Sequence, residues 1–339
     1  MKKLVVSMTL ALAVAFTCWT ASAGTLEQIK ERGFVKAGVN VGLPGFSFPD
    51  KTGNWSGLDV DFARAVAAAV LGDKDKVRFT PLSGKERFTA LQSGEVDLLS
   101  RNTTWSMQRD TSLGLNFVGV IFYDGTGFMV KKDLGLKNAL ELKGATVCVN
   151  TGTSNEVDMA DFFRAHKIEY KAATFESVDA IVTAFESGRC DAYCGDRSGL
   201  AAQRLKMKNP ELFVLLPDVI SKEPLGPVVR HGDDQWFDIV KWTLFAMIDA
   251  EERGITSTNI DQIKATSSDP NVRRILGLEG DLGPGTGLSK DWAYRIIKQV
   301  GNYGEIFNKN FGPQTPFKME RGLNALWLKG GLIYAPPLR

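Results

Sequence analysis

Short apolar runs alternate along the chain with stretches whose apolar residues recur at helical spacing. This alternation is typical of an α/β architecture, because strands buried on both faces are continuously apolar while the helices that cover them keep a polar face. The first half of the chain predicts strands over residues 34–41, 77–81 and 96–100 and helices over residues 59–70 and 85–92.

A second series of the same kind begins near residue 145. It predicts a strand over residues 145–150, helices over residues 153–166 and 177–186, and a strand over residues 191–195. No close sequence repeat accompanies it, so the recurrence is one of architecture. Two series indicate two lobes, and 339 residues are enough for two domains of ordinary size.

Residues 122–130 form an extended segment between the two series, and residues 219–225, which follow the second series, are a second candidate connector. The chain is therefore expected to leave the first lobe, build the second and return. Two such crossings make a hinge, and a hinge over a cleft is a ligand clamp. The expected division is a first lobe of residues 24–123 plus 225–339, a second lobe of residues 127–220, and hinges near residues 123–127 and 220–225.

The last hundred residues are mainly helical in pattern. They predict one strongly apolar helix over residues 236–248 and another helix over residues 289–311, with a loop-rich stretch over residues 277–287 between them. We interpret these segments as structural.

The first 23 residues have the pattern of a cleaved signal peptide. Lys2 and Lys3 precede an apolar run over residues 4–19, and Ala-Ser-Ala follows at residues 21–23. The run is shorter than the roughly 20 residues of a membrane-spanning helix, which disfavours a retained anchor. The residues before Cys18 are larger than a lipid-attachment site prefers. We therefore expect cleavage between Ala23 and Gly24 and a protein outside the cytoplasm.

Charge and cysteine content narrow the function further. Removing Lys2 and Lys3 from the 41 basic residues balances the 39 acidic ones, and no basic stripe suggests nucleic-acid binding. Three cysteines remain after the signal peptide, at positions 148, 190 and 194. Neither histidine lies near a cysteine pair, so zinc is disfavoured. In an oxidising compartment the composition favours one disulfide and one leftover thiol.

The polar residues at the predicted strand ends suit a zwitterionic ligand. An α-carboxylate is bound best by an arginine fork and free backbone N–H groups at a helix start, and an α-ammonium by a carboxylate with neutral oxygens. These groups should lie at the carboxyl ends of the strands, where open α/β sheets bind ligands. The candidates at such positions are Asn102, Thr104, Arg109, Thr153, Ser154 and Asp196.

Each candidate also has a structural interpretation. Arg109 alone would more often form a surface salt bridge, the Gly-Thr-Ser turn at residues 152–154 a helix cap, and Asp196 a solvated pair with Arg197. The ordered set, divided between the two lobes, favours the binding interpretation.

Several motifs resemble the polar-amino-acid-binding family of periplasmic solute-binding proteins that serve ABC importers, and its general L-amino acid-binding subgroup in particular. The resemblance covers the whole chain after the signal peptide, and the NTTW string is its most specific part. The matching strings are GLDVDFA at 57–63, LQSGEVD at 91–97, SRNTTW at 100–105, GRCDAY at 188–193 and the tail at 327–337.

The resemblance implies a two-lobed α/β fold of the type II periplasmic-binding-protein class, each lobe a mixed sheet flanked by helices, with the ligand cleft between the lobes. It implies that Arg109 binds the ligand carboxylate with help from Ser154, and that Asp196 accepts the ammonium. Thr104 and Asn102 match positions that serve both groups. No cofactor is implied.

The first loop departs from the pattern of binders for basic amino acids. Asn40 and Leu43 stand where those proteins have an acid and an aromatic, so a broad amino-acid range is expected. Phe46 either forms a wall of the side-chain pocket or packs in the core beneath the loop. Arg87 and Arg101 would favour acidic ligands if they reached the cleft, but we interpret them as solvated or structural.

The subgroup resemblance also suggests that Cys148 pairs with Cys190. Cys190 and Cys194 lie four residues apart on one predicted strand, about 13 Å at normal strand rise, which is too far for a bridge. Cys194 is then the leftover thiol.

The resemblance implies a non-enzymatic, monomeric protein that delivers free L-amino acids to an ABC permease in the membrane. The principal alternative is an exported dehydratase that acts on an amino-acid-like cyclohexadiene. Such an enzyme needs a further cleft acid once Asp196 binds ammonium, and the sequence offers none. A sensor domain is a third alternative, but no signalling module accompanies the predicted lobes.

Overall fold

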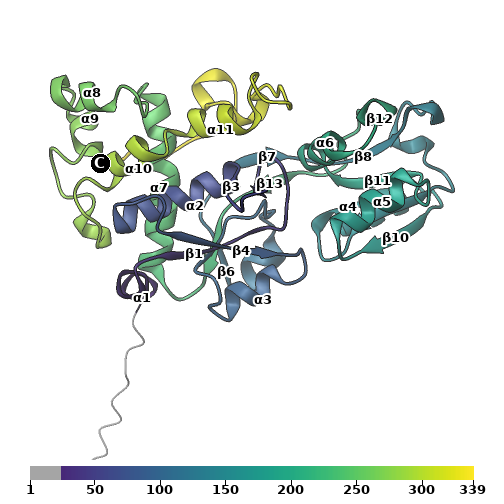
Figure 1. The fold of residues 1–339 in the computed structure, drawn as a ribbon, viewed down its shortest axis with the longest axis horizontal. Helices are drawn as coiled ribbons and strands as arrows, with labels where there is room; N and C mark the ends of the chain where they lie inside the picture. The colour runs from purple at the N-terminus through teal and green to yellow at the C-terminus, as the bar shows by residue number, and fades with distance from the viewer. Residues whose placement is uncertain (1–23) are drawn as a thin grey trace, which may run out of the picture.

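The computed structural model describes residues 24–339 (Figure 1). The predicted signal peptide lies outside the described residues. The chain forms two α/β lobes, each built on a five-stranded sheet, and a narrow two-stranded ribbon runs between them. The two-lobed α/β prediction is confirmed. Within residues 24–339, no helix combines the length and hydropathy that a membrane crossing requires.

The first sheet is mixed, as expected. Strand β1 pairs in parallel with β4 and β5, and the returning strand β14 pairs antiparallel with β5 and β6. Its strands in spatial order are β4 (Val77–Leu82), β1 (Val35–Asn40), β5 (Leu98–Leu99), β14 (Val228–Arg230) and β6 (Leu115–Phe117).

The second sheet has the same arrangement. Strands β10 and β11 flank β9 in parallel, and β8 and β12 complete the sheet antiparallel. Its strands in spatial order are β10 (Lys171–Phe175), β9 (Thr146–Asn150), β11 (Ala192–Asp196), β8 (Thr126–Lys131) and β12 (Phe213–Leu215).

Eleven α-helices of the described chain cover these sheets, and all but one of the predicted helices are confirmed. The second lobe carries α4 (Ser154–Ala165), α5 (Val178–Glu186) and α6 (Arg197–Lys206). The first lobe carries α1 (Thr25–Arg32), α2 (Leu58–Leu71), α3 (Arg87–Gln92), α7 (Asp234–Glu252), α8 (Ile260–Thr266), α9 (Pro270–Ile275), α10 (Trp292–Gln299) and α11 (Tyr303–Phe311).

The prediction of one helix over residues 289–311 is wrong. The structure divides this segment into α10 and α11 at Gly301, whose φ of 103° is outside the helical region. Asn302 then caps α11: its side chain accepts from the backbone of Glu305, whose carboxylate accepts from the backbone of Asn302.

The ribbon between the lobes consists of β7 (Phe122–Asp124) and β13 (Glu223–Leu225), paired antiparallel with Glu223 opposite Asp124. Both predicted crossings therefore lie side by side (Figure 1). Asn324, from the C-terminal segment, holds β7 by accepting from the Tyr123 N–H at 2.6 Å and donating to the Tyr123 carbonyl at 3.1 Å.

A loop that follows β1 packs closely on the start of α2. Residues 43–56 form this loop and include the short strands β2 (Phe48–Pro49) and β3 (Trp55–Ser56). A Cβ on Gly57 would lie 2.0 Å from the carbonyl oxygen of Phe46, so only glycine fits. The Phe46 side chain is 1 % exposed and packs against Phe122 and Phe311.

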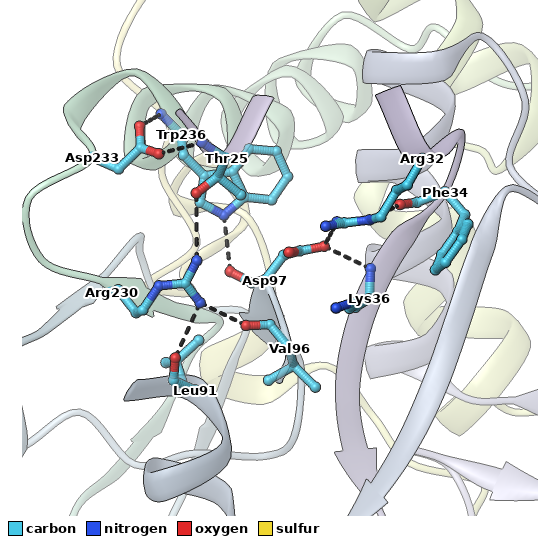
Figure 2. A network of polar contacts seen from close by, with 10 residues as sticks. All are labelled: Thr25, Arg32, Phe34, Lys36, Leu91, Val96, Asp97, Arg230, Asp233 and Trp236. Carbon is cyan, nitrogen blue, oxygen red and sulfur yellow. Dashed lines mark hydrogen bonds and ion pairs between the residues drawn. The ribbon is translucent and has the colours of Figure 1, made fainter. Parts of the chain in front are cut away.

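A polar network attaches the start of the described chain to the first lobe (Figure 2). Asp233 caps α7 by accepting from the Trp236 N–H at 2.9 Å, and its other oxygen accepts from the Thr25 N–H at 2.8 Å. The Trp236 indole donates to the Asp97 carbonyl, and Arg230 donates to the Thr25 hydroxyl. These bonds join α1, β5, β14 and α7 at the base of the lobe.

The second lobe is held by two apolar clusters and a disulfide. The clusters centre on Phe163 and Phe185. Cys148 and Cys190 form the disulfide with their Cα atoms 5.8 Å apart, and Cys194 is a buried free thiol. The pairing suggested by the resemblance is confirmed.

Removing this disulfide is expected to lower the free energy of unfolding by about 4 kcal/mol, because the bridge closes a loop of 42 residues in the unfolded chain. Urea unfolding of the Cys148→Ser/Cys190→Ser variant measures the loss. Adding a thiol reductant should lower the midpoint of the native protein and leave that of the variant unchanged. Equal midpoints for native protein and variant would contradict the expectation.

Candidate ligand-binding cleft

A polar pocket lies where the carboxyl ends of strands from both sheets face one another. Strand β1 ends at Asn40 and strand β9 at Asn150, and both side chains line the pocket. Side chains of both lobes form its walls, which are Asn40, Leu43, Arg87, Arg101, Asn102 and Thr104 from the first lobe and Asn150, Thr153, Ser154, Asn155, Val178, Tyr193, Cys194, Gly195, Asp196, Gly199, Leu200 and Gln203 from the second.

The two lobes touch across this pocket. The hydroxyl oxygens of Thr104 and Ser154 are 3.1 Å apart, although they belong to opposite lobes. At the rim, Lys85 of the first lobe forms a 2.9 Å ion pair with Glu176 of the second. The structure is therefore a closed arrangement of the lobes. The ion pair is exposed on both sides, so it contributes little to closure.

The first-lobe wall is the loop that follows β5. Asn102 has a φ of 33°, a left-handed conformation that asparagine tolerates better than most residues. Its N–H donates to the Asp59 carboxylate at 2.9 Å, and its side-chain oxygen accepts from Asn40 at 3.0 Å. Burial raises the pKa of Asp59 to about 7, although the hydrogen bond from Asn102 opposes the shift. This loop conformation directs Asn102 and Thr104 to the pocket.

Arg109 lies directly behind this wall. It occupies a single π-helical turn, Gln108–Ser112, and its side chain is buried. Its guanidinium donates from Nη1 to the Thr104 carbonyl at 3.0 Å and lies over the ring of Phe88. Burial lowers the pKa of Arg109, and the carboxylates of Glu223 and Asp196 oppose that shift. The surface-salt-bridge interpretation therefore does not describe Arg109.

Arg87 and Arg101 are buried and line the pocket, so the structure contradicts the solvated part of the solvated-or-structural interpretation and agrees with the alternative that they reach the cleft. Arg101 donates to the Leu82 carbonyl at 2.9 Å, and burial lowers its pKa to about 10. Burial and the neighbouring arginines hold the pKa of Arg87 well below its ordinary value. Within the described residues, the buried Nε of Arg87 has no hydrogen-bond partner. The wall is thus rich in positive charge that is only partly neutralised.

The second-lobe wall includes the start of α4. Thr153, Ser154 and Asn155 line the pocket, and the Thr153 hydroxyl donates to the Asn150 carbonyl at 2.7 Å. The first N–H groups of α4 and its dipole favour a negatively charged ligand group at this position. Thr153 and Ser154 were predicted from the turn between strand and helix.

Asp196 ends β11 and also lines the pocket. Its Oδ1 accepts from the side-chain amide of Asn155 at 2.8 Å. Arg197 donates instead to the carbonyls of Leu216 and Asp218, so a solvated Asp196–Arg197 pair is not what the structure contains. Burial raises the pKa of Asp196 to about 8, and repulsion from neighbouring carboxylates adds to the shift.

Phe46 belongs to the core and does not line the pocket, because the close packing of its loop on α2 directs the ring inward. Leu43 from the same loop lines the pocket instead. Sequence reasoning did not identify Asn150, Asn155 or Gln203. The two asparagines flank the Gly-Thr-Ser turn and were detectable by position, whereas nothing in the sequence distinguishes Gln203 on α6. Among residues 24–339, no cluster of three or more metal-ligating side chains occurs.

Two α/β lobes that close around one polar pocket and are joined by paired strands define a ligand clamp. A family model for bacterial extracellular solute-binding proteins, family 3, matches residues 35–254. The chain belongs to this family. The choice of a solute-binding protein over an exported dehydratase is thereby confirmed.

Two relatives and one solved structure are similar to this chain over nearly its whole length. The chain is 55% identical to the general L-amino acid-binding periplasmic protein AapJ of Rhizobium johnstonii, over the whole of both chains. It is 51% identical, again over both full lengths, to the glutamate/glutamine/aspartate/asparagine-binding protein BztA of Rhodobacter capsulatus. A solved periplasmic binding protein from Brucella ovis with glutathione bound is 54% identical and superposes with a TM-score of 0.91, covering 94% of this chain and 100% of that one.

Proposed function

We propose that this protein captures free L-amino acids of a broad range in the periplasm and delivers them to an ABC permease. One observation carries the proposal: Asp196 of the second lobe lines the pocket, and the buried Arg109 of the first lobe lies behind the opposite wall, where it donates to the Thr104 carbonyl. This is the charge pattern that a zwitterion requires. The names of AapJ and BztA, which are amino-acid-binding proteins, support it.

In the proposed complex, Arg109 and the start of α4 bind the α-carboxylate. The hydrogen bond to Thr104 occupies one nitrogen of Arg109, and the rest of the planar fork is assigned to the ligand. Asp196 and the oxygens of Thr104 and Asn102 bind the α-ammonium. Each charge of the ligand then has a partner inside a closed site, which its burial requires.

The two chain connections between the lobes serve as the hinges of the transport cycle. The first lobe, residues 24–123 and 225–339, and the second, residues 127–220, rotate about hinges near residues 123–127 and 220–225. Ligand favours closure through contacts made in the closed state alone. The permease recognises the closed monomer. Equal stimulation of a reconstituted importer by ligand-loaded and empty protein would contradict this step.

Thermal unfolding tests the proposal. The chain without residues 1–23 is refolded free of ligand and heated with each of the twenty L-amino acids and with several sugars. A ligand at 100 times its Kd adds about 2.7 kcal/mol of stability, which raises Tm by roughly 2 °C or more. Shifts with several amino acids and with no sugar are expected. The absence of a shift with every amino acid would contradict the proposal.

Arg87 is expected to set the relative affinity for acidic and neutral ligands, because it lines the pocket, is only partly neutralised and has a buried Nε–H without a hydrogen-bond partner among the described residues. Arg87→Gln should raise the Kd of L-glutamate at least tenfold and that of L-glutamine less than threefold, since these two ligands differ mainly in side-chain charge. Calorimetric titration measures both constants. An equal loss for the two ligands would assign Arg87 a purely structural role.

A further inference from the structure

Glu223 is a fully buried carboxylate in the ribbon between the lobes, and it does not line the pocket. Its Oε2 accepts from the hydroxyl of Thr104 in the first lobe and, at 2.8 Å, from the hydroxyl of Ser154 in the second. Its Oε1 accepts from Ser221 at 2.6 Å and from Thr126 at 3.2 Å. One oxygen atom of the hinge therefore holds two pocket hydroxyls, one from each lobe.

The backbone fixes this arrangement on the first-lobe side. Trp105 donates its N–H to the Pro224 carbonyl at 2.8 Å, and Gly226 donates to the Thr103 carbonyl at 2.9 Å. Thr104 is thereby paired with Leu225 of β13, two residues from Glu223. On the second-lobe side, Ser154 is the first residue of α4. In this closed arrangement, Glu223 therefore joins a hydroxyl of the first lobe to a hydroxyl of the second.

An ionised carboxylate accepts hydrogen bonds and donates none. Burial opposes ionisation of Glu223, but the hydrogen bonds that it accepts outweigh burial and lower its pKa. Burial and interaction with Glu223 raise the pKa of the neighbouring Asp158 to about 7. Both hydroxyl protons consequently point to Glu223, and the lone pairs of Thr104 and Ser154 remain for another donor.

We infer that Glu223 is a positioning residue. It presents the hydroxyl oxygens of Thr104 and Ser154 to the ligand as paired acceptors, and it holds these two hydroxyls together in the closed arrangement of the lobes. The two oxygens are 3.1 Å apart, and with both protons directed to Glu223 they have no hydrogen to share. A ligand ammonium that donates to both relieves this repulsion. The inference rests on the proposed amino-acid ligand and adds a residue that the ligand does not touch.

Asp124 provides a matched control, because it lies opposite Glu223 in the same ribbon and is partly buried. Its hydrogen-bond partners among residues 24–339 are Gly125, the next residue of the hinge, and Ser198 of the second lobe. Asp124→Asn thus removes a hinge carboxylate without freeing a pocket hydroxyl.

A double-mutant cycle with L-glutamine as the ligand tests the inference. Glu223→Gln should raise the Kd at least tenfold in the native background and less than threefold in a Thr104→Val/Ser154→Ala background, because the hydroxyls that it positions are then absent. Asp124→Asn should change the Kd less than threefold. An equal loss from Glu223→Gln in both backgrounds overturns the inference.

Two further measurements keep the test decisive. Glu223→Asp retains the charge but withdraws the carboxylate by one methylene, and it replaces Glu223→Gln in the cycle if that variant does not fold. Failure of the native protein to bind any L-amino acid would contradict the proposed function itself. If the native protein binds an L-amino acid but Glu223→Gln weakens binding equally in both backgrounds, only the role of Glu223 is contradicted.

Discussion

Arg109→Ala is expected to raise the Kd of every L-amino acid at least 100-fold. The substitution leaves the ligand carboxylate in a closed site without its fork, and removing one partner of a buried ion pair costs about 3–5 kcal/mol. A loss of about 3 kcal/mol corresponds to a factor of more than 100. Calorimetric titration of the ligand-free variant measures it directly.

Two variants separate charge, geometry and stability in this experiment. Arg109→Lys keeps the charge but loses the bidentate fork, so binding should remain at least tenfold weaker than in the native protein. Arg230→Ala removes a half-buried arginine of the same lobe that donates to the Leu91 and Val96 carbonyls and does not line the pocket. The Arg230→Ala variant should have a lower Tm and a Kd within threefold of the native value. An unchanged Kd in Arg109→Ala would exclude this arginine from the ligand.

Asp196 is expected to make binding depend on pH. Its pKa of about 8 without ligand means that most molecules carry a proton there at pH 7. An ammonium beside it favours the ionised form, so binding releases that proton. The affinity should therefore rise with pH between about 6 and 8, by up to tenfold per unit, and level off above the ligand-free pKa. Affinity is lost as the pH falls through this window.

Titration in buffers of different ionisation enthalpy measures the proton release. Asp196→Asn should weaken binding at least tenfold at pH 8 and remove most of the pH dependence. Asp124→Asn should keep the pH dependence and move it to lower pH, because the Asp124 carboxylate helps to raise the pKa of Asp196 and the proposed complex gives Asp124 no ligand contact. An affinity that falls between pH 6 and pH 8 would contradict the assignment of Asp196 to the ammonium.

Pattern alone predicted most of the fold, because the strands are continuously apolar and the helices keep helical spacing. The two-crossing division followed from the extended segments that now form β7 and β13. The single helix over residues 289–311 failed because apolar spacing continues across Gly301, while backbone conformation and the Asn302 cap end the helix. The Asn-x-x-Glu string at residues 302–305 was the available sign of a new helix start.

The site was predictable where it follows strand ends and not where it depends on tertiary packing. Asn102, Thr104 and Asp196 lie at or just after strand ends, and the structure brings all three to the pocket. Arg87 lies on a helix face and Glu223 in a hinge strand, where a charged residue is usually solvated. The structure buries Arg87 at the pocket wall and Glu223 in the ribbon between the lobes.

Small-angle X-ray scattering of the ligand-stripped protein tests the central claim most directly, because it requires neither a label nor a mutation. The radius of gyration is measured without ligand, with saturating L-glutamine or L-glutamate, and with a sugar. We expect the amino acids to lower the radius of gyration to that of the closed structure and the sugar to leave it unchanged. A radius of gyration that no L-amino acid changes, in protein shown to be open and folded, would contradict the account.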